Sequence, residues 1–314
     1  MTTEELIAAR RAEPWREALR KSKKNKERTD IPRVEMNELD AEYRSHTRLE
    51  EVNLGLTKEQ AMQEAQRCLD CPNPTCMQGC PVSINIPTFV KNIERGEFLE
   101  AAKVLKETSA LPAVCGRVCP QEKQCESKCI HLKMGKPAVA IGYLERFAAD
   151  YERESGNISV PEVAEKNGIK IAVVGSGPAG LSFAGDMAKR GYDVTVFEAL
   201  HEIGGVLKYG IPEFRLPNKI VDVEIEGLRK MGVKFLTNCI IGKTISYEDL
   251  HADGFKGIFA ASGAGLPNFM NIPGENLIGV MSSNEYLTRV NLMDAANPES
   301  DTPVLQGKKV AVIG

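Results

Sequence analysis

The pattern of apolar and polar positions changes its period near residue 168. Before this point, apolar residues recur at the spacing of amphipathic helices, in segments 57–69, 87–96, 97–108 and 137–154. After it, short β-branched runs predict strands at 169–174, 193–198, 233–236 and 257–262. Helical segments separate these runs at 181–191 and 218–232. The alternation of strand and helix is typical of βαβ units and predicts a parallel sheet.

Local signals refine two of the helices. Thr57, followed by Gln60, predicts a capping box, so Cys68 should lie near the end of that helix. Pro137 is predicted to occupy the first turn of the helix that follows it.

These patterns divide the chain into four parts. We predict an N-terminal extension (1–55), a helical domain (56–155), an α/β domain (165–306), and a last segment (307–314) that reads as a strand. The extension is polar and broken by prolines, and we expect an arm that wraps something else. Its basic run, 16–28, is partly balanced by acidic residues at 34–43, which favours a solvated, partly helical segment over a functional basic patch.

A glycine-rich motif connects the first strand of the α/β domain to its first helix. Gly175, Gly177 and Gly180 have the spacing of a dinucleotide-binding loop, and Glu198 ends the next strand about 20 residues on. The helix N-terminus should bind a pyrophosphate, and Glu198 should accept hydrogen bonds from ribose hydroxyls. The predicted loop consists of Gly175, Ser176, Gly177, Pro178, Ala179 and Gly180.

Cysteines are the second chemical signal. The chain begins without a secretory signal and contains no apolar run of about 20 residues, so we expect a cytoplasmic protein, where disulfides are rare. The net charge of −3 does not suggest nucleic-acid binding.

Eight of the nine cysteines lie in the helical domain, spaced Cys68-x2-Cys71-x4-Cys76-x3-Cys80-Pro81 and Cys115-x3-Cys119-Pro120-x5-Cys125-x3-Cys129. Zinc sites generally use paired CxxC motifs or mixed Cys/His sets, so two iron–sulfur clusters are the favoured interpretation and a zinc-stapled scaffold is the alternative.

Several motifs together resemble one family. The cysteine pattern, CGRVCP (115–120), GSGPAG (175–180), YGIPEFRLP (209–217) and KKVAVIG (308–314) look like the small (β) subunit of NADPH-dependent glutamate synthase. The group also includes the N-terminal half of dihydropyrimidine dehydrogenase, the large subunit of ferredoxin:NADP transhydrogenase, and sulfide dehydrogenase-type relatives. The likeness runs from about residue 35 to the last residue. It implies an α-helical bis-[4Fe–4S] ferredoxin-like domain followed by an incomplete α/β Rossmann-type FAD-binding domain.

The resemblance assigns the ligands of two clusters. One would be held by Cys68, Cys71, Cys76 and Cys129. The other would be held by Cys80, Cys119, Cys125 and the carboxylate of Glu145. Cys115 would then be a non-ligand; in the alternative, Cys115 is the ligand and Glu145 is an ordinary surface acid. Cys239 reads as a buried small apolar residue.

The resemblance also extends the flavin site beyond the glycine loop. It implies that FAD is contacted by Val118, Gly205, Val206, Arg215 and Gly263 in addition to the loop. An ordinary surface role for Arg215 is the alternative. The bulk of the chemistry would belong to the cofactors, so no catalytic side chain is predicted.

The implied function is electron transfer. Electrons from NADPH would pass through FAD and two [4Fe–4S] clusters to a glutamate synthase large subunit or another acceptor subunit, for glutamate synthesis from glutamine and 2-oxoglutarate. Transhydrogenase or sulfide dehydrogenase roles are alternatives, and a non-catalytic FAD and iron–sulfur module is an alternative of another class. In the family, the motif at 307–314 opens the NADPH-binding domain, so we expect a chain ending at Gly314 to bind NADPH poorly. Neither a nucleic-acid nor a membrane partner is expected, and homo-oligomerisation stays open.

Overall fold

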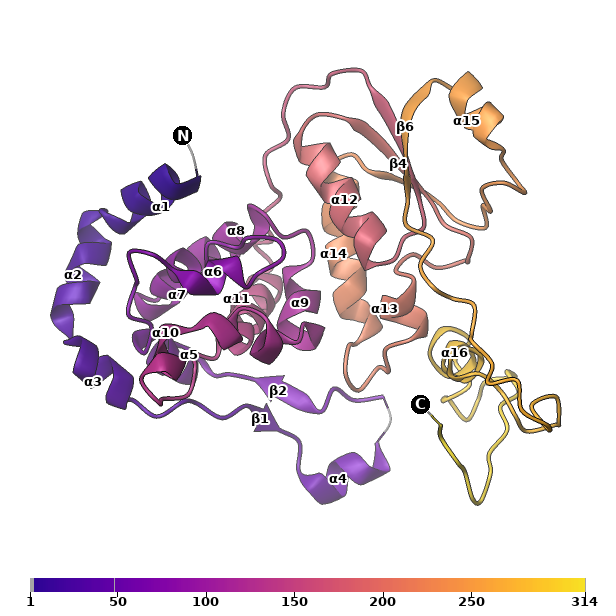
Figure 1. Cartoon of the computed structure of the whole chain (residues 1–314), viewed down its shortest axis with the longest axis horizontal. Coiled ribbons are helices and arrows are strands. Elements are labelled where there is room, and N and C mark those ends of the chain that lie inside the picture. Colours follow the sequence, from indigo (N-terminus) through magenta and orange to yellow (C-terminus); the bar gives the residue numbers. More distant parts are fainter. Residues whose placement is uncertain (1–2, 48, 314) are drawn as a thin grey trace.

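Two packed bodies make up the molecule, one helical and one built on a parallel sheet (Figure 1). The computed structural model describes residues 3–47 and 49–313. Residues 1–2 and 48 of the predicted extension, and Gly314 of the predicted last segment, lie outside the described residues.

The helical body follows from the amphipathic segments of residues 57–154. Its helices are α5 (Lys58–Gln66), α6 (Thr75–Gln78), α7 (Ile86–Glu94), α8 (Phe98–Lys106), α9 (Pro112–Val118), α10 (Ile130–Lys133) and α11 (Ile141–Ser155). The predicted capping box is confirmed, because the Thr57 hydroxyl accepts from Gln60 N and the Gln60 side chain accepts from Thr57 N. The predicted position of Pro137 is wrong: α11 begins four residues later, and its first turn lies at Ile141. In the described part of the chain, no helix is both long and apolar enough to cross a membrane.

The second body is a four-stranded parallel sheet in the order β5-β4-β3-β6. Its strands are β3 (Lys170–Val174), β4 (Asp193–Phe197), β5 (Lys234–Leu236) and β6 (Phe255–Ala260). Helices α12 (Pro178–Lys189) and α14 (Asn218–Lys230) cover one face, and α15 (Tyr247–Ala252) lies near the other; a short helix, α13 (Val206–Tyr209), follows β4. Cys239 is buried beside Ala172 and Leu250, which confirms its interpretation as an apolar core residue.

The two bodies share a hydrophobic core. Leu111, Ala113 and Val114 from the α9 region pack in one cluster with residues of β3, β4, α12 and α14. The helical body keeps a separate core around Phe89, Leu105 and Leu144. Helix α9 therefore belongs to both bodies, and its C-terminal end leads directly to Cys119.

The N-terminal extension wraps the chain's own helical body. Helices α1 (Thr3–Arg11), α2 (Pro14–Ser22) and α3 (Asn25–Asp30) curve around one side of it, and α4 (Ala41–His46) and the hairpin of β1 (Asn37–Glu38) and β2 (Asn53–Gly55) follow (Figure 1). The expectation of a solvated basic run is wrong for Arg16 and Arg28, which are each 1% exposed. Both are buried because each forms an ion pair with a buried carboxylate of the helical body, Asp70 and Glu94.

The chain beyond β6 runs outside the sheet. It contains α16 (Ser283–Leu287) and one π-helical turn (Thr288–Leu292), and the described residues of the predicted last strand form no strand. Val310, Val312 and Ile313 are instead largely exposed. The strand prediction for this segment is wrong in this structure because a strand requires a hydrogen-bonded neighbour, and the described part of the chain places none beside these residues.

Candidate cofactor sites

Four cysteines line one cavity of the helical body. Cys68 follows α5, Cys71 lies in the next loop, Cys76 lies in α6, and Cys129 precedes α10. The remaining wall is mainly apolar, and includes Ile86, Val90, Val139 and Ile141. These four thiols are the set that the sequence analysis assigned to the first cluster. They surround a space rather than a point: in the described part of the chain, no three His, Cys, Asp or Glu side chains could together hold one metal ion.

Burial makes three of these thiols poor anions on their own. It raises the pKa of Cys68 to about 11, and burial also raises the pKa of Cys71 and, further, that of Cys76. A thiolate in such a site needs a compensating cation, which the iron of a cluster supplies. An all-thiol donor set around an apolar cavity thus fits a [4Fe–4S] cluster.

The second predicted ligand set comes from four places: Cys80 follows α6, Cys119 follows α9, Cys125 precedes a short 3-10 turn, and Glu145 lies in the second turn of α11. Burial, with smaller contributions from the negative charges of Glu145 and Cys80, raises the pKa of Cys119 to about 11. Burial raises the pKa of Cys125 as well, with contributions from Glu126, Glu145 and Cys80. The four predicted ligands Cys80, Cys119, Cys125 and Glu145 are therefore electrostatic neighbours.

Glu145 carries an unusual feature for a surface acid. It is 5% exposed, and its Oε1 atom is buried without a hydrogen-bond partner among the described residues. Burial, with a smaller contribution from the charge of Glu224, raises the Glu145 pKa to about 8. A buried unpaired carboxylate oxygen is costly, and iron ligation would satisfy it. Reading Glu145 as an ordinary surface acid does not fit this burial.

Cys115 lies close to the same carboxylate. Burial is the main reason that its pKa is raised, and the charge of Glu145 adds to the effect. The nearby Ser109 hydroxyl acts in the opposite direction. Cys115 as the ligand in place of Glu145 stays the alternative.

Glycines allow these elements to approach one another. A Cβ on Gly116 of α9 would lie 2.5 Å from the backbone nitrogen of Arg146 in α11. A Cβ on Gly142 would lie 2.3 Å from the side chain of Gln121. The absence of side chains at these positions brings the helix that leads to Cys119 against the helix that carries Glu145.

The predicted dinucleotide loop has the expected close contacts. Gly175 has φ +102°, and a Cβ there would lie 2.4 Å from the carbonyl oxygen of Ala261. A Cβ on Gly180 would lie 2.0 Å from the Gly175 oxygen. Gly177, in contrast, has no heavy atom within 4 Å of the position of a Cβ. The first and third glycines are thus required by packing, whereas the second faces open space next to the N-terminus of α12.

Glu198 supports this loop directly. Its Oε2 atom accepts hydrogen bonds from Ser176 N at 2.8 Å and Ser176 Oγ at 2.5 Å, and its Oε1 accepts from Leu200 N at 2.9 Å. Ser176 Oγ in turn accepts from Gly204 N at 2.9 Å. The sequence pattern predicts that Glu198 binds a ribose, and no local motif marks this bracing role. Ribose binding by its remaining lone pairs stays a prediction.

A second glycine pair lies against the loop. Gly205 has φ +53°, and a Cβ there would lie 2.8 Å from the Cα of Gly177. Val206, Pro178 and Ala179 are exposed or half-exposed beside it. The remaining predicted contacts are less closely tied to the loop: Val118 packs partly into the shared core, and Gly263 and Arg215 are exposed. No ion pair or side-chain hydrogen bond involves Arg215 within the described residues, so surface and cofactor roles both stay open.

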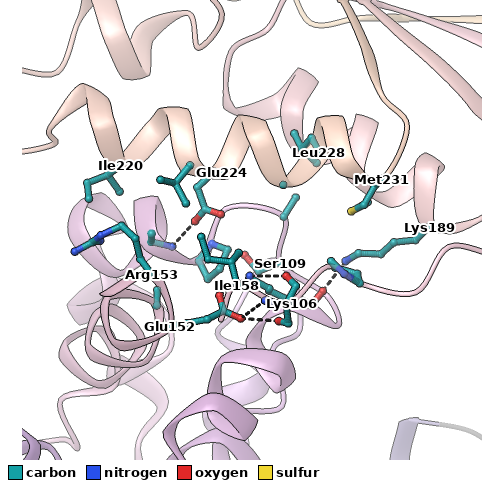
Figure 2. A pocket seen from close by; sticks show the side chains of 18 residues that line it. Lys106, Ser109, Glu152, Arg153, Ile158, Lys189, Ile220, Glu224, Leu228 and Met231 are labelled. Carbon is teal, nitrogen blue, oxygen red and sulfur yellow. Dashed lines mark hydrogen bonds and ion pairs between the residues drawn. The ribbon is translucent and has the colours of Figure 1, made fainter. Parts of the chain in front are cut away.

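A further cavity lies between the two bodies and was not predicted. Figure 2 shows its walls, which come from the α8–α9 region and α11 on one side and from α14 on the other. Glu224 of α14 accepts a 2.6 Å hydrogen bond from Ala113 N of α9. Burial raises the pKa of Glu224 to about 7. No local motif marks this residue, because its partner lies more than a hundred positions away in the sequence.

Comparison with known proteins gives two family matches. Residues 44–157 match the family described as dihydropyrimidine dehydrogenase domain II, 4Fe-4S cluster. Residues 173–231 match the family described as NAD(P)-binding Rossmann-like domain. The first match covers both predicted cysteine sets and Glu145, and favours iron–sulfur clusters over zinc. The second covers the glycine loop, Glu198 and the second glycine pair.

Curated relatives cover both regions together. PreT, an NAD-dependent dihydropyrimidine dehydrogenase subunit of Escherichia coli O157:H7, is 40% identical over 70% of this chain and 54% of its own length. The putative oxidoreductase UacF of Escherichia coli K12 is 36% identical over 85% of this chain and 42% of its own length. The small chain of NADPH glutamate synthase from Halomonas elongata is 36% identical over 82% of this chain and 54% of its own length.

The chain spans about half the length of the curated relatives that it matches. Within that span, the iron–sulfur region precedes the Rossmann-like region, in the order expected from the sequence motifs. Through its 4Fe-4S region and its Rossmann-like region, the chain is similar to the small chain of NADPH-dependent glutamate synthase and to the PreT subunits, over about half of their length.

Proposed function

We propose that this chain is the electron-input part of an oxidoreductase that binds FAD and two [4Fe–4S] clusters and delivers electrons from NADPH to a partner subunit. The observation that carries the proposal is the gathering of Cys68, Cys71, Cys76 and Cys129 around one cavity, in a body that packs directly on a dinucleotide-binding fold. When bound, FAD supplies hydride acceptance from a reduced nicotinamide and the clusters supply one-electron transport.

The chain's own residues would bind and space these groups. Gly177 leaves room for a pyrophosphate at the N-terminus of α12, where free N–H groups favour an anion. Glu198 holds the loop in this shape through Ser176. FAD rather than NAD is favoured at this loop by the glycine pair at 204–205, which follows the acidic residue in the pattern of flavin enzymes of this fold.

Helix α9 would fix the distance between the flavin and the second cluster. Its N-terminal half lies in the core shared with α12 and α14, and its C-terminal end leads to Cys119. We propose Cys80, Cys119, Cys125 and Glu145 as ligands of that cluster, because the charge of Glu145, with its otherwise unpaired oxygen, acts on Cys119 and Cys125, on which Cys80 also acts.

Glutamate synthesis from glutamine and 2-oxoglutarate, with a large subunit as electron acceptor, is the first candidate for the overall reaction. It is supported by small-chain relatives at 32–36% identity. A second candidate is electron delivery to a dihydropyrimidine dehydrogenase partner with NADH as the donor, because the relatives named PreT reach 40% identity.

Anaerobic purification tests the proposal in stages. The protein should be brown, contain FAD and about eight iron atoms, and lose its broad visible absorbance on reduction with dithionite. A colourless protein with zinc and no iron would contradict it. The candidate reactions are then separated by adding each partner subunit with NADPH or NADH, and measuring glutamate formation or pyrimidine reduction.

A further inference from the structure

The loop between the first two cysteines contains a buried aspartate. Asp70 lies between Cys68 and Cys71, its side chain is 0% exposed, and its backbone has φ +53°. This left-handed conformation is uncommon for residues other than glycine, although Asp tolerates it better than most. A buried carboxylate at such a position must be held by its neighbours.

The N-terminal extension supplies those neighbours. Arg16 donates through Nε to both carboxylate oxygens of Asp70, at 3.1 and 3.0 Å, and through Nη2 to Oδ1 at 2.5 Å. Arg20 donates to Oδ2 at 2.6 Å, and Arg11 donates to the Asp70 backbone oxygen at 2.9 Å. The aspartate is therefore an anion fixed by α1 and α2.

A further cation lies next to a proposed ligand. The charge of Lys91 acts on the Cys68 thiol. Lys91 in turn donates to the Cys68 backbone oxygen at 2.5 Å. Hydrogen bonds and positive charge at cluster sulfurs favour the reduced, more negative state.

Positive charge exceeds negative charge around this loop. Asp70 pairs with Arg16 and Arg20, and Glu94 pairs with Arg28 and Lys91, which gives four cations for two carboxylates. The nearby pair of Arg67 and Glu64 is balanced. A [4Fe–4S] cluster bound by four thiolates carries net negative charge in both of its usual oxidation states. The surplus of cations complements that charge.

We propose that helices α1–α3 act as an electrostatic clamp on the first cluster, in which Arg16 and Arg20 fix Asp70 and so position the Cys68–Cys71 ligand loop and raise the cluster's reduction potential. This inference rests on the proposed [4Fe–4S] centre. It gives the N-terminal extension a specific role as a positioning element, beyond that of a cover for the helical body.

The decisive variant is Arg20→Gln, because Arg20 is 20% exposed and its loss leaves Arg16 to hold the fold. Lys21→Gln is the matched control: it removes the same charge from the same helix, but Lys21 is 75% exposed and pairs with the exposed Glu17. Arg20→Lys keeps the charge and tests rescue. Arg16→Met removes the main contact to Asp70.

The readouts are the midpoint potential of each cluster, from EPR-monitored redox titration, and the rate of iron release to a chelator. We expect Arg20→Gln to shift the first cluster's potential to a more negative value and to speed iron release, with a larger effect for Arg16→Met. The first cluster's potential and the rate of iron release should stay near the wild-type values in both Arg20→Lys and Lys21→Gln. The second cluster should not shift, since no hydrogen bond or ion pair in the described part of the chain joins α1–α3 to its proposed ligands.

Equal potentials in Arg20→Gln and Lys21→Gln, in a protein with both clusters, would overturn the clamp while leaving the proposed function intact. Wild-type protein without iron–sulfur clusters would overturn both. If Arg16→Met does not fold, the comparison of the first cluster's potential in Arg20→Gln and Lys21→Gln still tests the clamp.

Discussion

Gly79 and Gln124 approach so closely that a Cβ on Gly79 would lie 2.6 Å from the Gln124 backbone oxygen. Gly79 precedes Cys80, and Gln124 precedes Cys125, so this contact joins two segments that each carry a proposed ligand of the second cluster. Because the obstacle is backbone rather than a flexible side chain, a methyl group at position 79 must push the segments apart.

Gly79→Ala is therefore expected to impair the second cluster selectively. We expect loss of about half of the bound iron with retention of the first cluster's EPR signal, because the proposed iron is divided equally between two [4Fe–4S] clusters. Gly227→Ala is the matched control, since Gly227 lies in α14 and no heavy atom lies within 4 Å of the position that its new methyl group would take. That change should keep all iron and stabilise α14 by about 0.5–1 kcal/mol. Full iron content in Gly79→Ala would contradict the proposal that this contact positions Cys80 and Cys125 as ligands of the second cluster.

Local sequence patterns anticipated most of the elements near the candidate sites. The βαβ unit, the glycine loop and the capping box at Thr57 depend on residues a few positions apart, and the structure contains each of them. The cavity formed by four cysteines followed from motif spacing together with family resemblance.

What the sequence could not reveal depends on distant pairs. Arg16 reads as part of a solvated basic run until Asp70 lies beside it, and nothing marks Glu224 within the helix predicted at 218–232 until α9 covers it. The apolar residues at 310–313 show the opposite error: their β-branched pattern predicts a strand, but strand formation depends on a neighbour that local pattern does not supply.

Glu145 provides a test of the oxygen ligand. Glu145→Ala should lose or alter the second cluster, seen as a changed EPR signal and a lower iron content, whereas Glu145→Gln should retain a cluster with a shifted potential because the amide oxygen can still bind iron. Glu154→Gln, on the same helix with its side chain 71% exposed, is the control. Unchanged EPR spectra of both clusters in Glu145→Ala would exclude Glu145 as a ligand and favour Cys115.

Two glycines of the loop allow the effect of a substitution on flavin binding to be measured separately from its effect on folding. Gly177→Ala meets no protein atom within 4 Å, so we expect an unchanged melting temperature but reduced flavin content, because the methyl group occupies space proposed for the pyrophosphate. Gly180→Ala would place a Cβ 2.0 Å from the Gly175 oxygen, and should cost about 1–3 kcal/mol of stability as well as flavin. Flavin absorbance and thermal unfolding of both variants measure the two effects. Normal flavin binding by Gly177→Ala would argue against a cofactor at this loop.

Glu224 predicts a dependence of stability on pH. Burial raises its pKa from 4.5 to about 7 in the folded protein, so the folded state binds more protons than the unfolded state between these values. Stability should therefore fall as pH rises from about 4.5 to 7, by a few kcal/mol for this group, and then level off. Glu224→Gln should flatten this part of the profile, because a glutamine keeps an acceptor for Ala113 N and does not titrate.

The comparison is best made on the melting temperature at pH 5 and at pH 8, with Glu226→Gln as the control on an exposed position of the same helix. Wild type and Glu226→Gln should lose stability in parallel between the two pH values, while Glu224→Gln should lose less. Since Glu224 joins α14 to α9, the variant also reports on the contact between the two bodies. A parallel loss in all three proteins would mean that Glu224 has an ordinary pKa in the folded protein and is therefore not buried at this contact.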